Sequence, residues 1–258
     1  MSSGAGESWV RDDLLTVDGV EFAVIAHSDG YLEDVSTPDR FVIAKNRSLV
    51  EEVASVVAEL APKRIVDLGI YKGGSTALLA LLAAPLKLTA VDVNREPVAA
   101  LTELIEKRGL GDVISPHYGV DQADADAMTS LIEADHGDEP LDLVFDDASH
   151  LYRESRSSFE VLFPRLRPGG RFVIQDWAWA HYPGDVWQRA GGWFHDRPAL
   201  TNLVVELVMA AGSRPDLVAE VTVRRETVVV VRGPAEVDGP MVLEDCYLNR
   251  GLTYRALI

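Results

Sequence analysis

One stretch, residues 64–75, constrains the fold of this chain more than any other. It reads RIVDLGIYKGGS, a short apolar run that closes at Asp67, followed by a turn that contains Gly69 and Gly73. The Ala- and Leu-rich residues 76–84 come next and predict a helix. A strand, a tight glycine turn and a helix N-terminus suit a nucleotide-like ligand, because glycine lets the backbone bend sharply and approach the ligand.

Short apolar runs and helical patterns alternate after this turn. The expected strands are 64–68, 86–91, 112–118, 141–145 and 171–174, and the expected helices between them are 73–84, 96–108, 123–134 and 152–165. Repeated strand–helix units of this length are typical of an α/β fold, in which helices cover both faces of a parallel sheet. A later helix at 200–211 precedes two β-rich runs at 217–223 and 227–231, which predict an antiparallel hairpin. We therefore expect a mostly parallel sheet with an antiparallel end.

The regions before and after these strand–helix units are expected to lie outside the main domain. The expected organisation is a flexible segment at 1–16, an extension at 17–46, a main domain at 47–233 with an irregular loop at 177–197, and a C-terminal extension at 234–258. The extension at 17–46 alternates apolar and polar residues around Ser-Asp-Gly at 28–30, which indicates one or two strands or a hairpin outside the main sheet. A helix is predicted over 49–60, with Asn46 or Ser48 as its N-cap. The C-terminal extension is too apolar for a free tail, so we expect it to fold back or to cross to another subunit.

Composition excludes several classes of partner. The net charge of −17 argues against nucleic acid, which requires a basic surface, and against an anionic membrane. The single cysteine, Cys246, cannot form a disulfide within the chain, is expected to be packed rather than nucleophilic, and fits a reducing cytosol. Residues 1–13 lack the pattern of a signal peptide, and the longest apolar stretch, 76–86, is too short to span a bilayer. We expect a cytoplasmic protein with a small-molecule partner.

The spacing of the turn separates it from the dinucleotide-binding type, Gly-x-Gly-x-x-Gly, because Tyr71 occupies the position of the second glycine. The spacing found is Asp-x-Gly-x-x-x-Gly, from Asp67 to Gly73, and Asp92 ends the second expected strand. With the terminal hairpin, these residues resemble class I S-adenosylmethionine-dependent methyltransferases over about 47–233. The resemblance implies a Rossmann-like, doubly wound sheet of seven strands, mostly parallel, with a C-terminal antiparallel hairpin.

The same resemblance implies which residues hold the cofactor. Asp67 and the turn amides would face the methionine moiety, and Asp92 would accept hydrogen bonds from both ribose hydroxyls. The full expected set is Asp67, Gly69, Lys72, Gly73, Ser75, Asp92, Val120, Asp121 and Asp146, with Val120 and Asp121 near the adenine. The alternatives are a tight turn without a ligand, a surface position for Asp121, and a role for Asp146 in orienting its loop.

Polar residues also follow the fourth and fifth expected strands, as DDASH at 146–150 and QDW at 175–177. The carboxyl ends of neighbouring parallel strands meet at the ligand-binding edge of an open sheet, so these side chains are expected to lie together. A divalent cation usually compensates such carboxylates, and Mg²⁺ takes oxygen ligands. The expected ligands are Asp147, Gln175 through its amide oxygen, and Asp176. Without a metal, the two acids would position the cofactor or cap a helix.

His150 lies three residues after Asp147 and is the expected catalytic base. A metal bound to a substrate hydroxyl lowers the pKa of that hydroxyl, and histidine, with an ordinary pKa of about 6.5, is suited to take the proton. The alternative for His150 is a packed histidine at a helix start. His181 and His195 are the other candidate bases.

Asp147, His150 and Asp176 further resemble metal-dependent O-methyltransferases of natural-product sugars, the macrolide-sugar and cephalosporin-hydroxylase-like group. In that group the strand-end acids hold Mg²⁺ and the histidine acts as base. Gln175 departs from the pattern, because the family position is a glutamate. The loss of one negative charge predicts weaker metal binding.

Four of the five tryptophans fall within seventeen residues, at positions 177, 179, 187 and 193. A long irregular segment after a strand is usually functional, and flat aromatic faces suit sugars or aromatic aglycones. The expected acceptor-binding residues are Trp177, Trp179, His181 and Tyr182. The alternative is that these rings pack against the scaffold or a neighbouring subunit.

Together these features predict an S-adenosylmethionine-dependent O-methyltransferase with Mg²⁺, acting on a hydroxyl of a small molecule, with a sugar on a bacterial secondary metabolite as first choice. The chain is expected to form a homo-oligomer. The alternatives are a metal-independent methyltransferase of the same fold, a nicotinamide-dependent oxidoreductase, against which Tyr71 counts, and a non-catalytic binding subunit.

Overall fold

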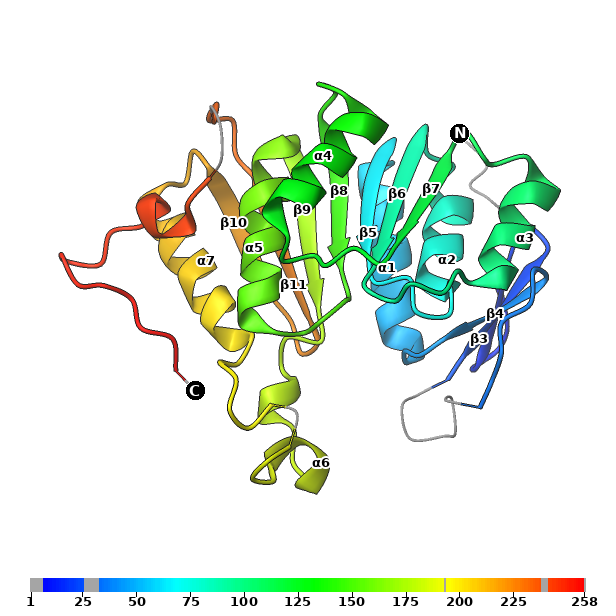
Figure 1. Cartoon of the computed structure of the whole chain (residues 1–258), viewed down its shortest axis with the longest axis horizontal. Helices are drawn as coiled ribbons and strands as arrows, with labels where there is room; N and C mark the ends of the chain where they lie inside the picture. The colour runs from blue at the N-terminus through cyan, green and yellow to red at the C-terminus, as the bar shows by residue number, and fades with distance from the viewer. Residues whose placement is uncertain (1–6, 26–32, 193, 238–240, 258) are drawn as a thin grey trace. The chain divides into compact units, whose positions relative to one another are not determined.

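The computed structural model describes residues 7–25, 33–192, 194–237 and 241–257. The chain divides into two compact units, Met1–Val120 and Asp121–Ile258. Figure 1 shows strands and helices in both units.

Seven strands form the main sheet. They are β5 (Arg64–Leu68), β6 (Lys87–Asp92), β7 (Ile114–Tyr118), β8 (Leu141–Asp146), β9 (Leu166–Gln175), β10 (Val218–Val223) and β11 (Thr227–Arg232). Their order is β10-β11-β9-β8-β5-β6-β7. The β5–β6, β6–β7 and β8–β9 pairs are parallel, whereas β11 runs antiparallel to both β9 and β10. The expected α/β fold, a mostly parallel sheet with a C-terminal antiparallel hairpin, is confirmed.

The predicted helices appear in the predicted order with shifts of a few residues at their ends, and a further short helix, Asp185–Gln188, lies within 177–197, the segment expected to be irregular. The helices are α1 (Arg47–Leu60), α2 (Gly74–Ala83), α3 (Ala99–Arg108), α4 (Ala125–His136), α5 (Tyr152–Leu162), α6 (Asp185–Gln188) and α7 (Thr201–Ser213). Of the two proposed N-caps of α1, Asn46 is the one used, because its side chain accepts the backbone N–H of Leu49 at 3.0 Å. The helix expected over 152–165 ends earlier, at Leu162, and a 3₁₀ turn at Phe163–Arg165 leads into β9.

The first unit also contains a separate four-stranded sheet, with the order β1-β2-β3-β4. Its strands are β1 (Glu7–Arg11), β2 (Leu14–Val17), β3 (Val20–Val24) and β4 (Arg40–Ile43). The expectation of a flexible segment over 1–16 is therefore wrong for the residues described there. The physical reason is burial: Leu14 and Leu15 are 7% and 0% exposed, and the guanidinium of Arg47 stacks 4.4 Å from the ring centre of Trp9.

The hairpin expected within 17–46 lies elsewhere than predicted. β3 and β4 pair parallel, so they cannot form a hairpin, and the Ser-Asp-Gly at 28–30 lies outside the described residues. The hairpin joins β2 to β3 through Asp18 and Gly19, which take φ values of 47° and 77°. Asp-Gly is a favoured two-residue turn, because both positions need a left-handed backbone.

The C-terminal segment 241–257 folds back onto its own unit, as one of the two expectations had it. The Tyr247 hydroxyl donates to Glu206 of α7 at 2.9 Å, and the backbone N–H of Leu257 donates to the Asn202 side chain at 2.7 Å. Cys246 is buried, and burial raises the pKa of its thiol. The cysteine is therefore a packed residue in this fold.

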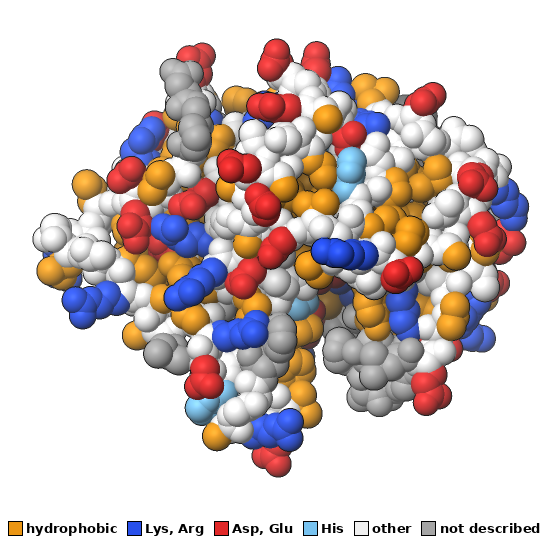
Figure 2. Space-filling view, in the orientation of Figure 1, with side chains coloured by type: hydrophobic (Ala, Val, Ile, Leu, Met, Phe, Trp, Pro, Cys, Tyr) orange, Lys and Arg blue, Asp and Glu red, His pale blue; other side chains and the backbone are white. Residues whose placement is uncertain are grey.

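Charged side chains of both signs cover the one face of the molecule that Figure 2 shows. On the face shown in Figure 2, Asp and Glu side chains are spread among Lys and Arg side chains rather than gathered in one patch. Within the described ranges, no helix has the length and apolar character needed to cross a bilayer.

Candidate active site

The turn between β5 and α2 is held in place by Asp92, the last residue of β6. One carboxylate oxygen of Asp92 accepts the backbone N–H groups of Ile70 and Tyr71 at 3.0 and 2.8 Å, and the other accepts that of Asn94 at 2.7 Å. Tyr71 has a φ of 48°, an uncommon backbone conformation for a bulky side chain. Asp92 therefore orients the turn, and its expected contact with ribose hydroxyls stays a prediction.

Packing explains the glycines at 73 and 74. A Cβ atom on Gly74 would lie 2.2 Å from the backbone oxygen of Val42 in β4, and one on Gly73 would meet three side chains at 3.3 Å. The carboxylate of Asp67 is 0% exposed and accepts the Thr76 hydroxyl at 2.6 Å. These contacts tie the turn to the first unit's own core, and the cofactor roles of Asp67 and Gly73 stay predictions.

Three further cofactor candidates lie in the same turn. Gly69 has a φ of 102°, which favours glycine. The Ser75 hydroxyl donates to the Gly69 carbonyl at 3.4 Å, and the Lys72 ammonium donates to the backbone carbonyl of Asp34. The N-terminal sheet segment thus contacts the turn at Lys72 as well as at Gly74.

The two adenine candidates, Val120 and Asp121, differ in exposure. Val120 is half-buried, and its backbone N–H donates to the carbonyl of Asp92 at 3.0 Å. Asp121 is exposed, and its carboxylate accepts the backbone N–H of Ala123 at 2.9 Å. A local turn of this kind matches the surface alternative for Asp121.

Asp146 lies at the end of β8 and is only 2% exposed. Its carboxylate accepts the Gln122 amide at 3.2 and 3.3 Å, and the same amide nitrogen reaches Ser158 at 3.1 Å. The amide oxygen of Gln122 accepts the backbone N–H of Ser149 at 3.1 Å. Burial raises the pKa of Asp146, against the hydrogen bond from Gln122 that lowers it. This arrangement supports the alternative in which Asp146 orients the loop after β8.

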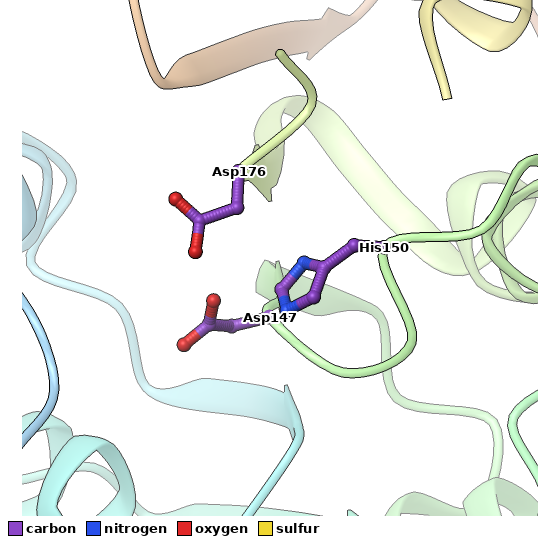
Figure 3. A group of neighbouring side chains, drawn as sticks. All are labelled: Asp147, His150 and Asp176. Carbon is purple, nitrogen blue, oxygen red and sulfur yellow. The ribbon is translucent and has the colours of Figure 1, made fainter. Parts of the chain in front are cut away.

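Asp147, His150 and Asp176 converge at the ends of β8 and β9. One ligand atom from each lies within 4.8 Å of the others, and all three side chains are half-buried. Figure 3 shows the imidazole and both carboxylates turned toward one another. Ligand atoms about 2.2 Å from one ion lie at most about 4.4 Å apart, so small adjustments would let these three share a divalent cation. Among the described residues, this is the one group of three or more acidic, His or Cys side chains with such spacing.

Backbone conformation at this group is unusual. His150 and Asp176 have φ values of 56° and 58°, in the left-handed region that non-glycine residues seldom occupy. Residues held there cost of order 1–3 kcal/mol and cluster at functional sites. The backbone N–H of Asp176 donates to the carbonyl of Glu226 at 2.7 Å, which fixes the end of β9 against the β10–β11 connection.

Gln175, the third predicted ligand, is 1% exposed and lies opposite Thr227 of β11. Neither atom of its side-chain amide has a hydrogen-bond partner in the structure, and the Thr227 hydroxyl also has none. Buried polar atoms without partners are rare in native proteins and call for a ligand, water or ion. The predicted metal role of Gln175 stays a prediction.

The aromatic segment after β9 packs directly on this group. The Trp179 ring lies 4.1 Å from the His150 ring, centre to centre. Trp179 also contacts Trp187 at 5.0 Å and Phe194 at 5.9 Å, and Tyr182 meets Trp187 edge-on at 5.9 Å. These rings form one aromatic cluster beyond the carboxyl ends of β8 and β9, where Figure 1 shows α6. The rings pack on one another and on His150, and the acceptor-binding role of Trp177, Trp179, His181 and Tyr182 stays a prediction.

The connection between β10 and β11 anchors the aromatic segment. The indole N–H of Trp177 donates to the carbonyl of Arg224 at 2.9 Å, and the Tyr182 hydroxyl donates to the Glu226 carboxylate at 2.9 Å. Burial and the nearby Glu226 raise the pKa of Tyr182, so this hydroxyl remains protonated. Trp193 lies outside the described residues.

The alternative bases are less well placed than His150. His181 is exposed, and its ring contacts the Thr201 hydroxyl. His195 is exposed, and its Nδ1 lies 2.7 Å from the Asp196 carboxylate. The converging group of Asp147 and Asp176 includes neither of them.

Comparison with known proteins agrees with the fold. Residues 66–177 match a family model described as a methyltransferase domain. Residues 66–177, which include the turn and the three converging side chains, are thus similar to a methyltransferase domain. Demethylmacrocin O-methyltransferase of Streptomyces fradiae is 47% identical over 64 residues, 25% of this chain and 15% of the relative. L-olivosyl-oleandolide 3-O-methyltransferase of Streptomyces antibioticus is 35% identical over 121 residues, 47% of this chain and 30% of the relative. The matched stretches thus span under a third of these relatives.

Solved methyltransferase structures share the fold of this chain. The MycE methyltransferase of the mycinamycin pathway, solved with Mg, SAH and mycinamycin VI, superposes with a TM-score of 0.54 at 22% identity. The superposition covers 71% of this chain and 49% of MycE. At this identity the likeness establishes the fold alone.

Two residues near the converging group are absent from the predicted site residues. Gln122 bridges Asp146 and the loop that carries His150, and Glu226 binds Tyr182. Neither belongs to a strand-end motif of acids. Gln122 follows Asp121 in an acid-rich stretch, and Glu226 lies between the two runs of the expected hairpin.

Proposed function

We propose that this chain is an S-adenosylmethionine-dependent O-methyltransferase that methylates a hydroxyl of a small molecule, with a sugar on a bacterial secondary metabolite as the acceptor. The match to a methyltransferase domain supports the reaction. Relatives named for O-methylation of olivosyl and rhamnosyl compounds support the acceptor class. The observation that carries the proposal is the convergence of Asp147, His150 and Asp176 in this domain.

In this proposal the cofactor binds at the turn that Asp92 orients. The predicted set, from Asp67 through Asp146, supplies amides and carboxylates for the methionine, ribose and adenine portions. The solved MycE relative contains SAH, which supports this choice of cofactor. Asp121 and Asp146 contribute least in this scheme, because Asp121 is engaged in a local turn and Asp146 is buried.

Asp147 and Asp176 would hold a divalent ion, which lowers the pKa of an acceptor hydroxyl and orients it when bound. Their two negative charges match a divalent cation, and Gln175 adds an uncharged amide. His150 faces both carboxylates, so it stands where it can serve as proton acceptor or as a further ligand. The aromatic cluster, with Trp177, Trp179, His181 and Tyr182, would bind the acceptor through flat apolar faces.

Calorimetry and radiolabelled transfer test the proposal. We expect the purified chain to bind SAH but not NAD, and to transfer labelled methyl from S-adenosylmethionine to a panel of macrolides whose sugars carry free hydroxyls. Exhaustive chelation with EDTA should reduce the transfer rate. Transfer that survives chelation would support the metal-independent alternative. Tight NAD binding without SAH binding would overturn the proposal, and an absence of both would favour a non-catalytic subunit.

The proposed location is the cytoplasm, which the single buried Cys246 and the lack of an internal disulfide support. The proposed assembly is a homo-oligomer. Exposed leucines in the C-terminal segment, Leu248 and Leu257 at 86% and 77%, support it as a surface that a second copy would cover. Light scattering coupled to gel filtration measures the mass in solution, and a monomer would contradict this assembly.

A further inference from the structure

Glu226, in the connection between β10 and β11, contacts the candidate site through two different groups. Its backbone carbonyl accepts the N–H of Asp176 at 2.7 Å, and its carboxylate accepts the hydroxyl of Tyr182 at 2.9 Å. The first contact uses a main-chain carbonyl, which every residue type carries. The second contact depends on the side chain, and it places a negative charge of the hairpin against the aromatic segment.

The hydrogen bond between Tyr182 and Glu226 has an ionised acceptor in a partly shielded place. Both side chains are half-buried, and hydrogen bonds to a carboxylate are roughly twice as strong as those between neutral groups. Burial and the nearby Glu226 raise the pKa of the Tyr182 hydroxyl, which therefore keeps the proton that it donates. This contact is thus a stable restraint on Tyr182.

Tyr182 lies at one end of a continuous row of ring contacts. Its ring meets Trp187 edge-on at 5.9 Å, and Trp187 lies 5.0 Å from Trp179. The Trp179 ring in turn lies 4.1 Å from the ring of His150. Because each ring packs on the next, a shift of Tyr182 moves the aromatic faces that lie beside the three converging side chains.

The aromatic segment has little regular structure of its own to hold these rings. Within residues 177–192, its helices are a 3₁₀ turn at Trp179–His181 and α6 at Asp185–Gln188. Helices this short are not stable by themselves, because nucleation is unfavourable and few backbone hydrogen bonds follow it. The position of the segment therefore depends on contacts with other elements, and the bond to Glu226 is one that a charge strengthens.

We propose that Glu226 is a positioning residue for acceptor binding, which acts through Tyr182 to fix the aromatic cluster beside the site. The proposal rests on the proposed function, because it takes the aromatic cluster as the surface that binds the acceptor. A residue that holds a binding surface in its bound arrangement reduces the ordering that the acceptor must impose. Its loss therefore weakens acceptor binding and leaves the transfer to a bound acceptor nearly as fast.

The first test compares methyl transfer by Glu226→Ala and by the parent, with the macrolide that the parent methylates fastest and with saturating S-adenosylmethionine. We expect the KM for the macrolide to rise on the order of tenfold, as the loss of a hydrogen bond to a charged group predicts, with kcat and SAH affinity within about twofold. Glu226→Gln should restore most of the parent KM, because its amide oxygen still accepts the Tyr182 hydroxyl.

Glu220→Ala is the matched control on the same hairpin. The Glu220 carboxylate accepts the Thr222 hydroxyl at 2.6 Å within its own strand, so this change should leave the KM as it is. Tyr182→Phe removes the other partner of the hydrogen bond and should raise the KM as Glu226→Ala does. The double variant should be no worse than either single variant, because both remove the same contact. Additive effects would show that the two side chains act independently, and would overturn the proposal.

Hydrogen exchange followed by mass spectrometry, without cofactor or acceptor, tests the positioning itself. The amides of residues 177–192 should exchange severalfold faster in Glu226→Ala than in the parent or Glu220→Ala, while those of β8 stay protected and show that the variant folds. Unchanged exchange in this segment, or an unchanged KM in an active protein, would overturn the proposal. A parent that neither binds SAH nor transfers a methyl group would contradict the proposed function instead, and the exchange rates would still decide whether Glu226 holds the segment.

Discussion

At the scale of single residues, one buried carboxylate organises the second unit away from the site. Glu206 of α7 is 0% exposed. It accepts the Tyr152 hydroxyl at 2.6 Å, the Arg156 guanidinium at 3.2 Å and the Tyr247 hydroxyl at 2.9 Å. These donors come from α5 and the C-terminal segment, so one side chain links three parts of the chain. The negative charge of Glu206 is tolerated in the interior because each of these three groups donates a hydrogen bond to its carboxylate.

Glu206→Gln should therefore destabilise the protein far more than an ordinary surface change. An amide presents its own N–H groups to donors that need an acceptor, and it leaves the charge of Arg156 less compensated. We expect the free energy of unfolding, from urea titration, to fall by about 3 kcal/mol. Glu133→Gln on the exposed face of α4 is the control and should change it by less than about 0.5 kcal/mol. Equal small losses in both variants would show that the Glu206 contacts do not stabilise the fold.

The residue scale also shows how far a sequence can identify a site. Asp147, His150 and Asp176 are recognisable because acids and histidine follow two expected strands, and strand ends meet by topology. Gln122 and Glu226 are not recognisable in this way. Each acts through a contact made by a loop or hairpin, and the position of a loop depends on tertiary packing rather than on periodicity.

At the scale of elements, the cofactor turn rests on the N-terminal sheet. The backbone oxygen of Val42 in β4 occupies the space next to Gly74, the first residue of α2. The Lys72 ammonium reaches the carbonyl of Asp34 in the segment before β4. Thus β4 and the residues before it pack against the glycine turn between β5 and α2.

Gly74→Ala tests this dependence. The added Cβ would lie 2.2 Å from the Val42 oxygen, so β4 or α2 must move. We expect a loss of about 1–3 kcal/mol in unfolding free energy, typical of overpacking, and weaker SAH binding by calorimetry. Gly111→Ala is the matched control, because a Cβ there meets nothing within 4 Å. Its expected effect is neutral or slightly stabilising, and a Gly74→Ala protein that behaves like it would refute the contact.

The sequence predicts best those helices and strands whose apolar residues recur at a regular spacing. The strand at 64–68 and the predicted helices that follow it lie within a few residues of their expected positions, because apolar spacing alone distinguishes strands from helices there. The four-stranded N-terminal sheet was not predicted. Its β1 and β2 are four or five residues long, and the polar residues between them look like a free terminus. The Asp18-Gly19 turn was the available signal, since Asp-Gly between apolar runs is typical of a hairpin.

At the scale of the whole molecule, the balance of acidic and basic side chains determines how salt changes the stability of the folded protein. The chain has 41 acidic and 24 basic side chains, hence a net charge of −17. Excess charge of one sign repels itself more strongly in the compact state than in the unfolded chain. Surface ion pairs such as Arg214 with Asp216 at 2.9 Å act in the opposite direction, but each contributes little, because both charges are exposed to water.

Self-repulsion should therefore outweigh the ion pairs, and salt should stabilise the protein. The Debye length falls from about 30 Å at 0.01 M to about 8 Å at 0.15 M, which screens repulsion across the molecule while sparing contacts of about 3 Å. We expect the urea midpoint to rise between these concentrations of KCl. EDTA in every sample removes divalent ions that would stabilise through Asp147 and Asp176, and chloride avoids the surface exclusion that sulfate adds. A midpoint that falls with KCl would mean that the ion pairs dominate, and that the acidic excess is too dispersed to strain the fold.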